Sequence, residues 1–162
     1  MDKHALIILD LQNCFINRQT KLLPKKIKQH IEKKKYDFII FSKFINSERT
    51  SFVKKLNWNK CNLSPETDIV SELFDISLKN HIFEKNTYSI FKSIGFVDFL
   101  NQNKVSKLYF CGLDLDACIL ASAFEAFDLG FDFEILYDLS DSSANTDIND
   151  SAKKIIHRNL HW

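Results

Sequence analysis

Three side chains that could carry out hydrolysis come directly after strand-like runs of the sequence. Asp10 closes the apolar run 5–9, Lys85 follows the run 81–84, and Cys118 comes shortly after the run 107–111. A carboxylate can take up and return a proton, and a thiol can attack a carbonyl carbon. An ammonium group beside them would stabilise negative charge. If the fold brings the three together, they could hydrolyse a substrate through a covalent thioester.

Cys118 is the residue on which this hypothesis depends. It lies at the start of a predicted helix, 118–129, where the helix dipole and the free backbone N–H groups favour a thiolate. We therefore expect these groups, together with the positive charge of Lys85, to lower the pKa of the thiol. The same N–H groups could hold an oxyanion. The alternative is that Cys118 is only a small buried apolar residue, as most free cysteines are.

The elements that must position these residues alternate between strand and helix. Such a pattern predicts βαβ units and a mainly parallel sheet of five or six strands, in a three-layer α/β/α fold of Rossmann-like topology. Ligands bind beyond the carboxyl ends of such strands, where all three side chains fall. We expect one domain, residues 1–162. The predicted strands are 5–9, 38–41, 81–84, 107–111 and 133–137, and the predicted helices are 22–35, 68–74, 91–101, 118–129 and 149–159.

Composition excludes several other classes of protein. With 162 residues, 45% of them hydrophobic, the chain can bury a substantial core, and its formal net charge is only +1. That balance does not favour nucleic-acid binding. No apolar run approaches the roughly 20 residues of a membrane span, and no signal peptide is visible, so we expect a cytoplasmic protein without membrane contact. No pair among Cys14, Cys61, Cys111 and Cys118 has CxxC spacing, and we expect four free thiols.

Three segments of the chain resemble the isochorismatase-like cysteine hydrolases, in order and in spacing. They are Ile8-Leu-Asp10-Leu-Gln-Asn-Cys-Phe15, Glu84-Lys85-Asn-Thr-Tyr-Ser89 and Cys111-Gly112-Leu-Asp-Leu-Asp-Ala-Cys118. The resemblance spans nearly the whole chain and implies a catalytic triad of Asp10, Lys85 and Cys118. It also implies a cis peptide bond between Leu113 and Asp114, and an oxyanion hole formed by the backbone N–H groups of Asp114 and Cys118.

The resemblance further implies a small-molecule substrate and a homo-oligomer, either a dimer or a tetramer. The sheet of the family usually has a sixth strand after the last helix, and this sequence offers no clear segment for it. Aromatic side chains could wall a pocket for a flat or small apolar group, although aromatic residues this numerous belong mostly to the core. The candidates for substrate binding are Phe15, Phe44, Trp58 and Tyr88.

The sequence departs from one branch of that family. Nicotinamidases carry an Asp-x-His metal motif after the second strand, where this chain reads Phe41-Ser-Lys-Phe-Ile-Asn46. We therefore expect neither a metal nor another cofactor.

Our main hypothesis is a metal-independent cysteine hydrolase that cleaves a small C–N bond in an amide or carbamoyl substrate. Asp10 would act as general base and then acid, Lys85 would orient the other two groups, and Cys118 would form the thioester. One alternative is hydrolysis of the vinyl ether of isochorismate, which needs no thiol nucleophile. The other is a non-catalytic binding or scaffold protein, for which an intact triad would have no purpose.

Overall fold

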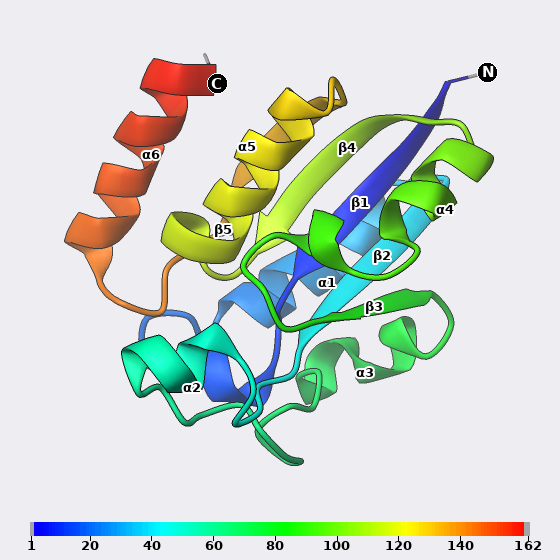
Figure 1. The fold of residues 1–162 in the computed structure, drawn as a ribbon. Helices are drawn as coiled ribbons and strands as arrows, with labels where there is room; N and C mark the ends of the chain where they lie inside the picture. Colours follow the sequence, from blue (N-terminus) through cyan, green and yellow to red (C-terminus); the bar gives the residue numbers. More distant parts are fainter. Residues whose placement is uncertain (1, 161–162) are drawn as a thin grey trace.

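The computed structural model describes residues 2–160, so both ends of the predicted domain 1–162 lie outside the described residues. It contains a five-stranded sheet in which all neighbouring strands run parallel, in the order β3-β2-β1-β4-β5 (Figure 1). The strands are β1 (Lys3–Leu9), β2 (Phe38–Phe44), β3 (His81–Lys85), β4 (Val105–Gly112) and β5 (Asp132–Ser140). The helices are α1 (Leu23–Lys33), α2 (Ser51–Leu56), α3 (Ser71–Ser77), α4 (Phe96–Gln102), α5 (Leu120–Asp128) and α6 (Thr146–Leu160).

Strand β1 is the centre of the sheet, and the strand order reverses beside it. The chain proceeds outward from β1 through β2 to β3, and then returns to the other side of β1 for β4 and β5. Ile8 of β1 pairs with Phe41 of β2 and with Cys111 of β4. The reversal between β1 and β4 leaves a crevice at the carboxyl ends of these two strands, because their following connections leave in opposite directions.

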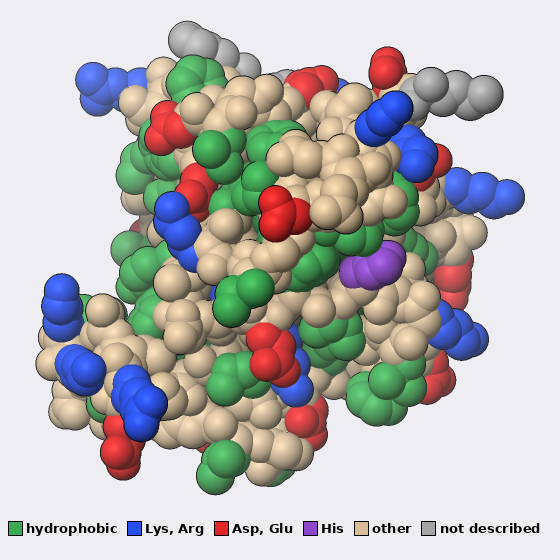
Figure 2. Space-filling model, turned by 45° about the vertical axis from the view of Figure 1, so that its right-hand side comes forward, with side chains coloured by type: hydrophobic (Ala, Val, Ile, Leu, Met, Phe, Trp, Pro, Cys, Tyr) green, Lys and Arg blue, Asp and Glu red, His purple; other side chains and the backbone are tan. Residues whose placement is uncertain are grey.

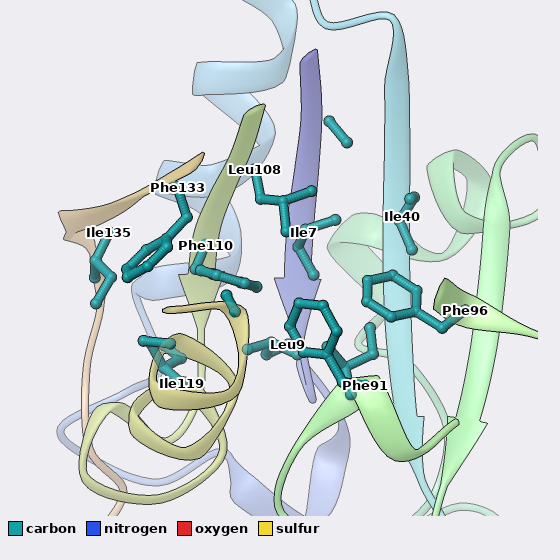
Figure 3. Close-up of a cluster of buried hydrophobic side chains, with 14 of the residues drawn as sticks. Ile7, Leu9, Ile40, Phe91, Phe96, Leu108, Phe110, Ile119, Phe133 and Ile135 are labelled. Carbon is teal, nitrogen blue, oxygen red and sulfur yellow. The ribbon is translucent and has the colours of Figure 1, made fainter. Parts of the chain in front are cut away.

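Helices cover both faces of the sheet, which explains why β1 is apolar throughout. Alternate residues of a strand point to opposite faces. Ile7 and Leu9 pack in a cluster with α4, α5 and α6, whereas Leu6 and Ile8 pack in a second cluster with α1 and α3. Figure 3 shows the first cluster, in which side chains of β1, β4 and β5 meet Phe96 of α4 and Ile119 of the turn that precedes α5. The predicted three-layer α/β fold is confirmed.

The structure corrects the prediction for two helices and adds a third. Gly95 has a φ of +78°, a left-handed conformation that glycine adopts without strain, and it divides the predicted helix 91–101. A 3₁₀ turn, Ile90–Lys92, precedes it and α4 follows. The helix predicted at 118–129 starts earlier, with a π-helical turn at Leu115–Ile119 that leads into α5. Helix α2 was not predicted. Within residues 2–160 the sheet has five strands and no sixth.

The expectation of four free thiols is wrong, because Cys14 and Cys61 form a disulfide bond. The two residues are 47 positions apart, and their Cα atoms are separated by 5.6 Å. Backbone contacts align the segment after β1 with the irregular connection before α3. The Cys14 N–H donates a hydrogen bond to the carbonyl oxygen of Glu66, and Gln12 forms an isolated antiparallel β-bridge with Ile69. This tertiary pairing, rather than any local spacing, brings the two sulfur atoms together.

Acidic and basic side chains both occur across the face shown in Figure 2, in keeping with the nearly balanced net charge of +1. None of the helices within residues 2–160 combines the length and the apolar composition that crossing a bilayer requires.

Candidate active site

The three residues of the predicted triad meet at the carboxyl ends of β1, β3 and β4. The ammonium nitrogen of Lys85 lies 2.7 Å from Oδ2 of Asp10 and donates a hydrogen bond to Sγ of Cys118 at 3.3 Å. All three side chains are almost inaccessible to water, with exposed fractions of 0% for Asp10, 5% for Lys85 and 7% for Cys118. Charged groups are rarely this deeply buried unless they are paired, so the arrangement is more than a chance contact.

Lys85 is held by a complete set of acceptors. Besides Asp10 and Cys118, its ammonium group donates to the carbonyl oxygen of Thr87 at 2.9 Å, and it lies 5.1 Å from the ring centroid of Phe44. Burial alone would lower the pKa of Lys85, but the Asp10 carboxylate and the Cys118 thiol outweigh that effect and leave the pKa raised. Lys85 therefore stays protonated across the neutral range.

One feature of the backbone before Cys118 agrees with the prediction, whereas the start of the helix does not. The peptide bond between Leu113 and Asp114 is cis, as expected. The N–H groups of Ala117 and Ile119, on either side of Cys118, both donate to the carbonyl oxygen of Asp114. Cys118 thus stands in the first turn of the helical segment, at the end where backbone N–H groups accumulate positive charge.

The expectation of a lowered thiol pKa is wrong for the free site. Burial of Cys118 and the nearby carboxylate of Asp10 raise the pKa of the thiol well above its usual value, and the opposing effect of Lys85 does not compensate. The helix terminus and Lys85 were visible as sequence features, whereas the depth of burial was not. In the resting protein the thiol is therefore protonated, and a base must remove its proton before it can attack.

Asp114 has a different environment from Asp10. Its two carboxylate oxygens accept hydrogen bonds from Ser143, Oδ1 from the backbone N–H at 2.7 Å and Oδ2 from the hydroxyl group at 2.8 Å. Burial raises the pKa of Asp114 to about 6, although the hydrogen bonds from Ser143 work in the opposite direction. The side chain of Asp114 therefore links the segment before α6 to the turn that carries the cis bond.

A pocket of about 500 Å³ opens onto Cys118, and the four predicted aromatic residues all line it. Phe15 and Trp58 stack nearly parallel, with ring centroids 6.0 Å apart and an interplanar angle of 15°. Phe44 lies 5.8 Å from Trp58, centroid to centroid, and Tyr88 forms the exposed rim. A somewhat larger groove of about 580 Å³ lies between α1 and β5, but none of the triad residues lines it.

Sequence reasoning missed several residues of this site. Ser42, on the adjacent strand, donates a hydrogen bond to Asp10. A single serine within a strand has no sequence pattern that would identify it as part of a site. Others come from segments that were not predicted as structured or were read as ordinary loops. They are Ile16, Asn17, Phe52, Leu56, Lys60 and Ser143, and Cys14 lines the pocket through its disulfide-bonded side chain.

The residues that the structure describes do not form a metal site of the kind that nicotinamidases carry. Within residues 2–160, no three His, Cys, Asp or Glu side chains are grouped so that they could share a metal ion. At the end of β2, where the Asp-x-His motif would stand, Phe44 faces Lys85 and the pocket, and the Asn46 amide donates to the carbonyl oxygens of Trp58 and Lys60.

The comparisons with known proteins agree on one family and one fold. A family model described as "Isochorismatase domain" matches residues 4–159. No curated protein matches the sequence significantly. Among solved structures, the pyrazinamidase/nicotinamidase of Streptococcus mutans is similar with a TM-score of 0.84 and 21% identity, over 98% of this chain and 97% of that chain.

Two further structures show the same fold. The N-carbamoylsarcosine amidase of Thermoplasma acidophilum has a TM-score of 0.83 and 16% identity, over 98% of this chain and 93% of that chain. An isochorismatase-like hydrolase of Alkaliphilus metalliredigens has a TM-score of 0.83 and 14% identity, over 96% of this chain and 91% of that chain. At such low identities these likenesses establish the fold alone.

Proposed function

Because the chain belongs to the isochorismatase domain family, we propose that it is a cysteine hydrolase that cleaves the C–N bond of a small, flat amide or carbamoyl compound. One observation carries the proposal: the Cys118 thiol, at the floor of an aromatic pocket, bonds to Lys85, which is itself paired with Asp10. Amidases among the similar structures support a C–N bond as the target.

The first half of the reaction forms a thioester. Asp10 takes the proton of the Cys118 thiol, whose raised pKa makes such a base necessary, and the sulfur attacks the carbonyl carbon of the substrate. The N–H groups of Asp114 and Cys118 receive the oxyanion. When the tetrahedral intermediate collapses, the C–N bond breaks and the proton on Asp10 passes to the leaving nitrogen.

The second half restores the enzyme. Water attacks the thioester carbonyl while Asp10 accepts one of its protons, the C–S bond breaks, and the sulfur takes the proton back from Asp10. The products are a carboxylic or carbamic acid and ammonia or an amine. Lys85 keeps its charge throughout, since its pKa is raised, and stabilises Asp10 and the sulfur in turn.

The shape of the pocket favours a flat substrate. The stacked pair of Phe15 and Trp58, together with Phe44 and Phe52, offers apolar faces against which a planar group can lie. The polar groups of the pocket, which include Asn17, Lys60 and Ser143, would bind substituents of the substrate away from the scissile bond.

The experiment is turnover of a defined panel by the purified protein: nicotinamide, pyrazinamide, benzamide, N-carbamoylsarcosine and isochorismate. We expect ammonia release from at least one of the amide or carbamoyl compounds, and none from Cys118→Ala. Mass spectrometry of a rapidly quenched reaction should show the acyl group on the peptide containing Cys118. Turnover of isochorismate alone would support vinyl-ether hydrolysis instead, and inertness toward the whole panel would favour a binding role.

A further inference from the structure

Ser42 occupies the strand that separates the two charged residues of the triad. In the sheet order, β2 lies between β1, which Asp10 directly follows, and β3, which ends at Lys85. Ser42 pairs with Phe83 of β3, and two residues later Phe44 pairs with Lys85. Ser42 therefore lies beside Asp10, on the strand that separates Asp10 from Lys85.

The hydroxyl group of Ser42 bonds to Asp10 twice. It accepts a hydrogen bond from the backbone N–H of Asp10 at 3.0 Å and donates one to Oδ1 of the same residue at 2.5 Å. A serine hydroxyl has one proton to donate, so its donor capacity is fully used. Since Ser42 is 1% exposed and Asp10 is 0% exposed, water cannot replace either bond without a rearrangement.

Asp10 needs this support more than an ordinary strand residue would. Its φ is +50°, in the left-handed region that is unfavourable for residues other than glycine. In this conformation the carboxylate, just beyond the end of β1, lies 2.7 Å from the ammonium nitrogen of Lys85. Without Ser42, both the buried N–H of Asp10 and one buried carboxylate oxygen would lose a partner.

We propose that Ser42 is a positioning residue of the active site, which acts through Asp10. By occupying Oδ1 it leaves Oδ2, the oxygen that faces Lys85, to exchange a proton with Cys118. This inference rests on the proposed function. A serine that merely fills space in the sheet would have no effect on proton transfer, and that difference can be measured.

The test compares Ser42→Ala with Ser42→Thr, which keeps the hydroxyl group on a β-branched side chain suited to a strand. The matched control is Ser140→Ala, because Ser140 is also a buried strand serine, but its hydroxyl group donates to the Leu136 carbonyl oxygen. Two quantities are measured at pH 7: kcat and KM for the best amide of the panel, and the rate of Cys118 alkylation by iodoacetamide, followed by peptide mapping. Thermal unfolding verifies that each variant is folded.

For Ser42→Ala we expect kcat to fall roughly tenfold to a hundredfold with KM within twofold, because general-base catalysis contributes about 10²–10⁴ and the base is displaced rather than removed. Alkylation of Cys118 should slow by a similar factor, because the thiol is protonated at rest and Asp10 must accept its proton as the sulfur attacks iodoacetamide. Ser42→Thr should recover most of both rates, and Ser140→Ala should change neither. A folded Ser42→Ala protein whose kcat and alkylation rate both stay within twofold of the parent would overturn the inference.

The alkylation measurement needs no substrate, so the positioning role of Ser42 and the proposed function can fail separately. If no amide is turned over but Ser42→Ala still slows alkylation and Ser42→Thr restores it, the positioning role holds and the proposed function fails. If an amide is turned over equally well by the parent and by Ser42→Ala, with unchanged alkylation, the proposed function holds and the positioning role fails.

Discussion

The ammonium group of Lys85 lies 2.7 Å from the carboxylate of Asp10, although their strands, β3 and β1, are not neighbours in the sheet. Adjacent strands are separated by about 4.8 Å, so β1 and β3 lie roughly 10 Å apart, and the extended Lys85 side chain reaches over β2 to meet the side chain of Asp10 between them. Only lysine and arginine reach that far, and the compact ammonium group of lysine also fits between two further acceptors, Cys118 and the Thr87 carbonyl oxygen. The ion pair thus depends on the register of three strands.

Removing the ammonium group should damage both stability and activity. In Lys85→Met the buried charge of Asp10 loses its partner, and breaking a buried pair in this way typically costs about 3–5 kcal/mol. We expect the free energy of unfolding in urea to fall by that amount and amide turnover to disappear. The control is Lys107→Met, whose partly exposed pair with Glu134 at 3.5 Å should contribute less than about 1 kcal/mol. An equal loss of unfolding free energy in the two variants would contradict this account of Lys85.

The fold could be predicted from the sequence because the sheet is buried on both faces. Runs such as the one ending at Leu9 are apolar without alternation, which identifies parallel strands covered by helices. The positions of Asp10, Lys85 and Cys118 followed, since each stands where a strand or its connection reaches the functional edge. The errors fell where local signals compete: Gly95 divides a predicted helix, and the π-helical turn before α5 has no sequence pattern of its own.

The rest of the site depends on tertiary contacts that no local pattern encodes. The disulfide joins residues 47 positions apart through an irregular connection, and Ser42 reaches Asp10 only after β1 and β2 pair in register. The direction of the Cys118 pKa shift was predicted wrongly for a related reason. Nearby charges are visible in a sequence once a site is guessed, but the burial that dominates here is a property of the packed structure.

The disulfide bond should be detectable by counting thiols and by measuring stability. Protein purified and denatured without reductant should expose two reactive thiols, those of Cys111 and Cys118. Because a cross-link over 47 residues restricts the unfolded chain, Cys14→Ser should lower the free energy of unfolding by about 2–4 kcal/mol under non-reducing conditions. With dithiothreitol present, the difference between parent and variant should largely vanish. Four thiols in the unreduced parent protein would show that the bond does not form in solution.

Asp114 should make stability depend on pH in the mildly acidic range. Burial raises its pKa from the ordinary value of 3.8 to about 6 in the folded protein, so between these values the folded state binds more protons than the unfolded state. Stability contributed by this group is therefore complete below about pH 4 and is lost as the pH rises toward 6. The shift corresponds to a loss on the order of 2–3 kcal/mol.

The measurement is the free energy of unfolding at intervals between about pH 3.5 and 8 for the parent and for Asp114→Asn. Asparagine keeps the shape and can still accept the hydrogen bond from the Ser143 N–H, but it does not titrate. We expect the difference between the two curves to change steeply between about pH 4 and 6 and to be flat above about pH 7. A constant difference across the whole range would mean that Asp114 titrates alike in the folded and unfolded states.

Chelation of metal ions should leave catalysis intact. A catalytic zinc requires about three protein ligands of the His, Cys, Asp or Glu type, and residues 2–160 group no such set. A zinc ion at the end of β2 would also compete for the thiolate that the proposed attack requires, since a thiol that coordinates zinc loses its proton to solvent and binds the metal as a thiolate. We expect amide turnover to be unchanged after prolonged dialysis against EDTA, and elemental analysis to find far less than one zinc or iron per chain. Loss of about one equivalent of zinc together with activity, and recovery of activity when zinc is returned, would replace the metal-independent mechanism with a metal-dependent one.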